Sequence, residues 1–150
     1  MKIQEILSKF EQKDDNLMNI LHAVQNNNPE NYLSQEELKE VATYLNLTMS
    51  HVYGVATYYS MLSLKPRGKY IIRVCNSPVC DMEGSRKVID RLKEILSINI
   101  GETTPDKKFT LELSECLGLC GRAPSMMINE DVVGGLDQID LKSVLEKYKS

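Results

Sequence analysis

Cys75-Asn-Ser-Pro-Val-Cys80 and Cys116-Leu-Gly-Leu-Cys120 are the two stretches that decide the fold, and together they contain all four cysteines of the chain. Each stretch follows a short run of β-branched or alternating apolar residues, which predicts a strand that delivers the first cysteine into a loop. Four thiolates from two loops can complete the coordination of a 2Fe-2S cluster, with two thiolates on each iron. The pattern therefore predicts a one-electron carrier.

Three kinds of site use paired cysteines, and residue type alone does not separate them. Zinc selects the same soft thiolate ligands as iron-sulfur clusters. Its structural sites favour two to four residues between the cysteines of a pair, and the four and three residues found here lie at the wide end of that range. Disulfide bonds are the third alternative, although paired cysteines in a reducing compartment more often bind metals or carry out redox chemistry.

The content of the second loop favours the cluster. Gly118 and Gly121 surround Cys120, and glycine lets backbone N–H groups approach cluster sulfur and tune its potential. The plant-type ferredoxin spacing is absent, and His22 and His51 lie far from any cysteine in the sequence, which excludes a Rieske arrangement. Spacing and loop content thus favour 2Fe-2S over zinc, and zinc over disulfides.

Nothing in the sequence predicts a catalytic group. The chain has no GxGxxG fingerprint, no GxxxxGK[ST] loop, and no nucleophile and base that can be paired with any specificity. We therefore expect no nucleotide site and no turnover by the chain alone.

Composition limits the partners and the location. The formal net charge is -3 and the pI is near 5.5, with Lys and Arg scattered among acidic residues, so a nucleic-acid partner is not expected. The N-terminus has no signal-peptide core, and no later stretch approaches the ~20 apolar residues of a membrane span. We expect a soluble, cytoplasmic protein without membrane insertion.

The first sixty or so residues have the periodicity of helices. Apolar residues recur at helical spacing over residues 3–10 and again over 17–24. Ser34 and Glu37 form a capping box that begins a third helix, and Thr48 caps a fourth.

The fourth helix is expected from His51 to about Met61, with Gly54 inside it. A glycine within a helix costs up to ~1 kcal/mol relative to alanine, which suggests a close helix contact, with a merely tolerated glycine as the alternative. Residues 63–68 then break the helical pattern and mark a boundary. We expect a helical region over residues 1–62 and a second domain over residues 69–150.

The second domain has the pattern β-α-β-β-β-α, for which a thioredoxin-like sheet is the simplest architecture, so the fold class is α/β. Pro124 stands just before the third strand and could hold a cis peptide, as proline often does in thioredoxin-like folds, but the base rate of about 5–6% for cis X-Pro bonds is too low to predict one. Asp140, three residues after Asp137, resembles a capping pair. The expected elements are strands over 70–74, 109–113, 125–128 and 132–133, and helices over 85–96 and from about Asp137.

Several motifs occur in a fixed order along the chain. They are Val52–Tyr59 (VYGVATYY), Leu64–Lys69 (LKPRGK), Arg73–Cys80, Gly101–Asp106 (GETTPD) and Glu115–Pro124 (ECLGLCGRAP). From about Tyr32 to its end the chain resembles the thioredoxin-like 2Fe-2S subunit family shared by NADH:quinone oxidoreductase, NAD(P)-dependent hydrogenases and NAD-dependent formate dehydrogenases. This order of motifs is more specific than either cysteine pair.

The resemblance implies the ligands and the partner. It implies that Cys75, Cys80, Cys116 and Cys120 hold one 2Fe-2S cluster. It also implies a larger iron-sulfur subunit that carries FMN, a 4Fe-4S cluster and the NAD(H) site, on which the helices of residues 1–62 dock in part. There the flavin converts a hydride into single electrons, and the neighbouring 2Fe-2S centre accepts or holds one of them.

The compact length and the helical lead-in favour the small subunit of a soluble, electron-bifurcating NAD(P)-dependent hydrogenase, with a catalytic hydrogenase subunit as a further partner. The equivalent subunit of respiratory NADH:quinone oxidoreductase or of formate dehydrogenase is the alternative. A free-standing ferredoxin-like module is a third interpretation, but a mobile ferredoxin does not need sixty additional residues.

Overall fold

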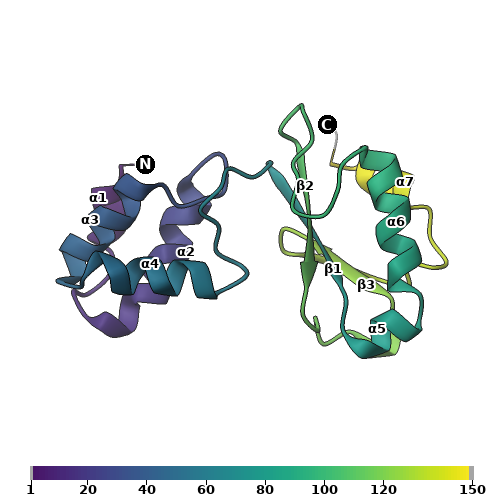
Figure 1. Ribbon diagram of the computed structural model, residues 1–150, viewed down its shortest axis with the longest axis horizontal. Helices are drawn as coiled ribbons and strands as arrows, with labels where there is room; N and C mark the ends of the chain where they lie inside the picture. Colours follow the sequence, from purple (N-terminus) through teal and green to yellow (C-terminus); the bar gives the residue numbers. More distant parts are fainter. Residues whose placement is uncertain (1, 149–150) are drawn as a thin grey trace. The chain divides into compact units, whose positions relative to one another are not determined.

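The computed structural model of the protein describes residues 2–148 (Figure 1). The chain divides into two compact units, Met1–Pro66 and Arg67–Ser150. The division falls within residues 63–68, where the helical pattern of the sequence stops. Each unit has a hydrophobic core of its own, so each is described separately.

The first unit consists of helices. The reciprocal capping box predicted for Ser34 and Glu37 is present, because the Ser34 hydroxyl accepts from the Glu37 N–H at 3.2 Å and the Glu37 carboxylate accepts from the Ser34 N–H at 2.8 Å. Thr48 caps the next helix by accepting from the His51 N–H at 3.3 Å. The elements are α1 (Ile3–Leu7), the 3-10 turn η1 (Asp14–Asn16), α2 (Leu17–Asn27), α3 (Gln35–Leu45) and α4 (Met49–Tyr58).

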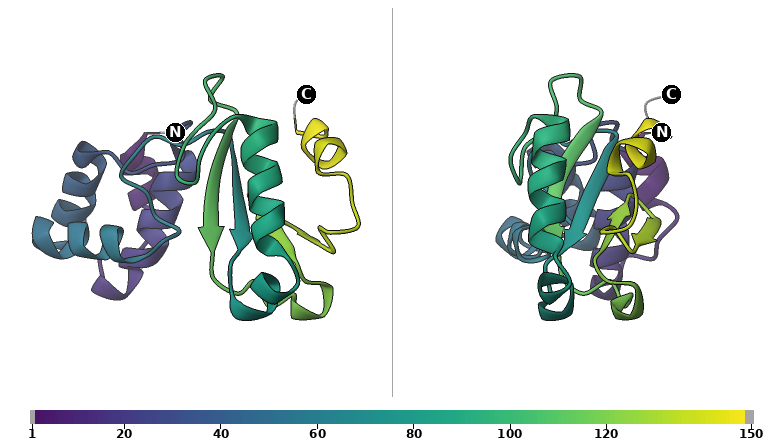
Figure 2. Two further views of the ribbon diagram at one scale, coloured as in Figure 1. Left: turned by 45° about the vertical axis from the view of Figure 1, so that its right-hand side comes forward. Right: turned by 90° about the vertical axis from the view of Figure 1, so that its right-hand side faces the viewer.

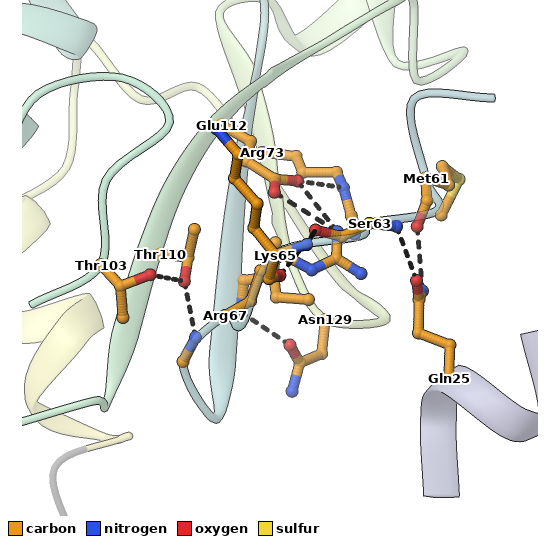
Figure 3. A network of polar contacts seen from close by, with 12 residues as sticks. Gln25, Met61, Ser63, Lys65, Arg67, Arg73, Thr103, Thr110, Glu112 and Asn129 are labelled. Atoms are coloured by element: carbon orange, nitrogen blue, oxygen red, sulfur yellow. Dashed lines mark hydrogen bonds and ion pairs between the residues drawn. The ribbon is translucent and has the colours of Figure 1, made fainter. Parts of the chain in front are cut away.

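The chain after α4 is tied back to α2 by one buried amide. Gln25 donates from Nε2 to the Met61 carbonyl at 3.0 Å and accepts at Oε1 from the Ser63 N–H at 2.8 Å (Figure 3). The fourth helix therefore ends at Tyr58 rather than at the predicted Met61. Tyr59 already has extended backbone angles, φ -87° and ψ 120°.

The second unit is a four-stranded sheet in the order β2-β1-β3-β4. Strand β1 pairs parallel with β2 and antiparallel with β3, and β3 pairs antiparallel with β4. The elements are β1 (Tyr70–Cys75), α5 (Pro78–Met82), α6 (Ser85–Leu96), β2 (Phe109–Ser114), the 3-10 turn η2 (Cys120–Arg122), β3 (Ser125–Ile128), β4 (Asp131–Gly134) and α7 (Leu141–Glu146). This order confirms the predicted β-α-β-β-β-α pattern and the thioredoxin-like architecture.

Helices α6 and α7 cover one face of the sheet (Figure 2). The core beneath them includes Ile72 and Val74 of β1, Leu111 of β2 and Leu92 of α6, all buried. Since side chains alternate across a strand, Arg73 and Cys75 face the opposite side from Ile72 and Val74. The parallel pair β1 and β2 places the first cysteine of each loop at the same edge of the sheet.

Three details of the second unit differ from the sequence prediction or were missing from it. The last helix begins at Leu141 rather than near Asp137, because Asp140 is its cap and accepts from the Lys142 N–H at 3.2 Å. The short helix α5 lies inside the first cysteine loop, with Pro78 at its start. The Ala123–Pro124 peptide is cis, the alternative that the base rate alone did not favour.

Candidate metal centre

The first cysteine pair is buried. Cys75 is the last residue of β1, where it pairs with Ser114 of β2, and Cys80 lies in α5, the short helix that follows. The two side chains are only 1% and 2% exposed. This pair is therefore shielded from solvent.

The second cysteine pair is exposed. Cys116 follows β2 by two residues and Cys120 begins the turn η2, and their sulfurs lie 3.5 Å apart. The Gly118 N–H donates to the Cys116 sulfur at 3.4 Å. Gly118 has φ +74°, a conformation that favours glycine, so the residue type lets this N–H point at the thiol.

Hydrogen bonds separate the acidities of the buried pair. The largest single influence on the pKa of Cys75 is burial, which raises it. Hydrogen bonds from the backbone of Ser77, the thiol of Cys80, the Ser77 hydroxyl and the backbone of Leu117 outweigh that burial, and the pKa is lowered. The pKa of Cys80 is raised, chiefly by burial and then by its hydrogen bond to Cys75 and the charge there.

The exposed pair is coupled to the buried pair. The pKa of Cys120 is raised first by its hydrogen bond with Cys116 and the charge there, and also by the charges of Cys80 and Cys75. The two pairs are therefore within electrostatic reach of each other. The two cysteine loops are therefore neighbours, since the backbone of Leu117 in the second loop also hydrogen-bonds to Cys75 in the first.

The chemistry of these donors suits a metal-sulfur group. Four thiols without a neighbouring carboxylate or imidazole in the set are soft ligands, which iron-sulfur clusters and zinc select. Among residues 2–148, no group of three or more His, Cys, Asp or Glu side chains gathers where it could hold a single metal ion. The four sulfurs form two pairs, one from each loop.

The second loop is packed against the end of β4. The Arg122 carbonyl accepts from the Gly135 N–H at 2.7 Å, and a Cβ at Gly134 would lie 2.7 Å from the same carbonyl oxygen. Only glycine fits at position 134 without moving the turn that carries Cys120. The sequence alone does not reveal this contact, because the strands β3 and β4 separate Gly134 from the turn that carries Cys120.

The surroundings of the buried pair include polar and apolar groups that sequence inspection also missed. The Ser125 hydroxyl lies 3.6 Å from the Cys80 sulfur. On α5, Met82 is 86% exposed and Val79 44% exposed, so the helix that holds Cys80 presents apolar side chains outward. Their positions next to a cysteine are visible in the sequence, but their exposure is not.

The two histidines lie outside this site. His22 is on α2 and His51 on α4, both in the helical unit. No helix in the described part of the chain is long and apolar enough to cross a membrane.

Comparison with known proteins extends the resemblance to nearly the full chain. The model of the thioredoxin-like [2Fe-2S] ferredoxin family matches residues 3–149, so the match includes the first helices, which lie before the start near Tyr32 expected from the motifs. An NADH-quinone oxidoreductase subunit of Aquifex aeolicus (strain VF5) is 38% identical over 147 residues, which are 98% of this chain and 91% of that protein.

A hydrogenase subunit is similar over the same span. NADP-reducing hydrogenase subunit HndA of Solidesulfovibrio fructosivorans is 33% identical over 147 residues, which are 98% of this chain and 85% of that protein. Among solved structures, an NAD+-reducing [NiFe]-hydrogenase in the air-oxidized state superposes with a TM-score of 0.75 at 21% identity. The superposition covers 93% of this chain but 24% of the hydrogenase chain, and at this identity it shows the fold alone.

Proposed function

Because the chain belongs to the thioredoxin-like [2Fe-2S] ferredoxin family, we propose that it holds one 2Fe-2S cluster on Cys75, Cys80, Cys116 and Cys120 and transfers single electrons. It acts as a subunit beside a larger subunit that oxidises NAD(P)H with a flavin. The observation that supports this proposal is that two neighbouring loops each carry a pair of thiols, with the Leu117 backbone of the second loop hydrogen-bonded to Cys75 of the first.

The residues of the site fit such a group. When bound, the cluster supplies a one-electron change that needs no proton donor from the protein. Cys75 and Cys80 hold it from the buried side, and Cys116 and Cys120 hold it at the surface, where a redox partner approaches. The Gly118 N–H offers a hydrogen bond to sulfur. FMN, a 4Fe-4S cluster and the NAD(H) site belong to the partner subunit in this proposal.

The helical unit supplies a surface for docking on that partner. Tyr53 and Tyr58 of α4 are 51% and 81% exposed. Between them Gly54 has no atom within 4 Å of the position where a Cβ would be, so the close helix contact suggested by the sequence is not made within the described chain. Aromatic side chains are enriched in the core of protein interfaces.

Two complexes remain candidates. The sequence favoured an electron-bifurcating, NAD(P)-dependent hydrogenase because the chain is compact, and the similarity to NADP-reducing hydrogenase subunit HndA supports that choice. A compact length alone does not distinguish a hydrogenase subunit from an NADH-quinone oxidoreductase subunit. The Aquifex aeolicus NADH-quinone oxidoreductase subunit is similarly compact, since the match covers 91% of its length. Purification of the native complex and identification of its other subunits decides between them. A cytoplasmic location is part of the proposal, because free thiolates require a reducing compartment.

Metal analysis of the anaerobically purified chain tests the cluster. We expect two irons and two sulfides per chain and a rhombic EPR signal after reduction by one electron. Stoichiometric zinc without iron would contradict the proposal. The chain without flavin should show no NADH oxidation, and detectable turnover would refute the role of a carrier.

A further inference from the structure

Serine hydroxyl groups lie beside both cysteines of the buried pair. Ser77 directs both its backbone N–H and its hydroxyl at the Cys75 sulfur. Ser125, which is 1% exposed, places its hydroxyl 3.6 Å from the Cys80 sulfur. The Cys116 sulfur, by contrast, accepts from the Gly118 backbone.

A third serine lies beside the same pair without a partner. The parallel register places Ser114 of β2 directly opposite Cys75 of β1, and the Asn76 N–H donates to the Ser114 carbonyl at 3.1 Å. The Ser114 Oγ is buried and has no hydrogen-bond partner within the described chain. A buried hydroxyl without a partner is unfavourable, so a group that accepts its proton should occupy this place in the working protein.

Thiolate or sulfide sulfur is the acceptor that this position offers. Cys75 is the neighbour across the strand pair, and backbone hydrogen bonds fix the separation of the two strands. We propose that the Ser114 hydroxyl, together with those of Ser77 and Ser125, donates to the sulfur atoms of the 2Fe-2S cluster on its buried side and thereby raises the reduction potential. This inference rests on the proposed function.

The direction of the change in reduction potential follows from the charge of the cluster. Reduction adds one electron to a group that already carries four thiolates, and a hydrogen bond to sulfur strengthens as the negative charge on the acceptor grows. The three hydroxyls therefore stabilise the reduced form more than the oxidised form. The solvent-shielded location strengthens the effect, because a low local dielectric increases the interaction of a dipole with a charge.

The test measures the reduction potential of the intact, cluster-bearing chain by an EPR-monitored redox titration. Ser114→Ala should lower the potential so that the ratio of reduced to oxidised cluster at fixed potential falls about threefold, which is about 30 mV for a one-electron couple. Ser85→Ala is the matched control, because the Ser85 Oγ at the start of α6 is also buried with no hydrogen-bond partner among residues 2–148, and it is not opposite a cysteine in the sheet. Its potential should equal that of the wild type.

A second pair of variants keeps the test decisive if Ser114→Ala binds the cluster poorly. Ser114→Thr and Ser114→Val have the same shape and differ by the hydroxyl, so Thr should have the higher potential. Comparison of proton ENDOR spectra of the reduced cluster in ordinary and deuterated buffer identifies the exchangeable couplings, and Ser114→Ala should have one fewer of them than the wild type. Equal potentials within both comparisons, or the same shift in Ser85→Ala, would overturn the inference. If the wild type contains no 2Fe-2S signal, the proposed function itself fails.

Discussion

At the scale of single residues, the exposure of Cys116 makes it the most informative of the four proposed ligands to replace. Its side chain lies at the surface, so a substitution by serine should leave the packing of the sheet unchanged. A serine hydroxyl is a harder and weaker ligand than a thiolate, so Cys116→Ser should perturb or abolish the cluster. The measurement is iron content together with the EPR spectrum.

In the assembled complex, Cys116→Ser distinguishes the role of the cluster from the role of the flavin. We expect impaired electron transfer through the complex, whereas NADH oxidation by the flavin subunit with an artificial dye should persist. Urea unfolding of the variant, compared with the wild type after chelation of iron, controls for an effect on the fold. Two irons with an unchanged spectrum would show that Cys116 is not a ligand.

Asp140 gives a prediction about pH. The pKa of its carboxyl is held below the usual range, first by the hydrogen bond from the Ser143 hydroxyl at 2.7 Å and then by the Lys142 N–H. Since the pKa is depressed in the folded state, the charged cap stabilises α7 above the unfolded carboxyl value of about 3.9. This contribution is lost as the pH falls through the lower folded value.

Asp140→Asn should therefore remove a part of the acid sensitivity. Asparagine still caps a helix but has no charge to lose, so the difference in unfolding free energy between wild type and variant should shrink as the pH falls below about 4. Acid releases the cluster from both chains alike, so the comparison cancels that effect. A difference that stays constant with pH would show that the charge of Asp140 does not stabilise α7.

At the scale of elements, a buried ion cluster joins β1, β2 and the segment before them. Glu112 accepts from Arg67 Nη1 at 3.3 Å and from Arg73 Nε at 3.2 Å (Figure 3). Both arginine side chains are almost fully buried. The pKa of Arg73 is lowered, chiefly by burial, although Glu112 opposes that change.

Glu112→Ala should therefore destabilise the sheet unit strongly, because it leaves two buried guanidinium groups without this carboxylate. Breaking a buried pair costs roughly 3–5 kcal/mol, and we expect about 3 kcal/mol here because the carboxylate is partly exposed. The measurement is the free energy of unfolding in urea. Asp81→Asn is the control, since Arg86 in the Asp81–Arg86 pair is 79% exposed and the loss of that pair should cost far less.

The elements that could be predicted from sequence are those with local signals. The capping box at Ser34, the Thr48 cap and the alternation of β2 each specify their element through neighbouring residues alone. The five-residue helix α5 was not predicted, because its segment within the cysteine loop has no repeat of apolar residues at helical spacing.

The candidate site shows the same division between local and distant signals. The cysteines and Gly118 were found from spacing, since each loop is continuous in sequence. The positions of Ser114 opposite Cys75 and of Gly134 under the Cys120 turn depend on strand register and on a hairpin, which no local pattern fixes.

At the scale of the whole molecule, the two units have separate cores, and this separation makes a truncation informative. The helical unit buries its apolar residues around Leu21 and Val41, and the sheet unit around Ile72 and Leu111. A chain that begins at Arg67 should therefore fold and retain its cluster. We expect it to lose its association with the flavin subunit, because α4 and its exposed tyrosines are gone.

A point variant tests the same docking role without removing the helical unit. Tyr58 is 81% exposed, so Tyr58→Glu should leave the fold and the EPR spectrum unchanged but place a charge in the proposed interface. Lys39→Glu, an exposed charge reversal on α3, is the matched control and should co-purify with the flavin subunit at the wild-type yield. The ratio of the two subunits after affinity purification is the measurement. Because truncation and Tyr58→Glu remove the same aromatic surface by different means, wild-type association of both would show that the helical unit is not the docking element.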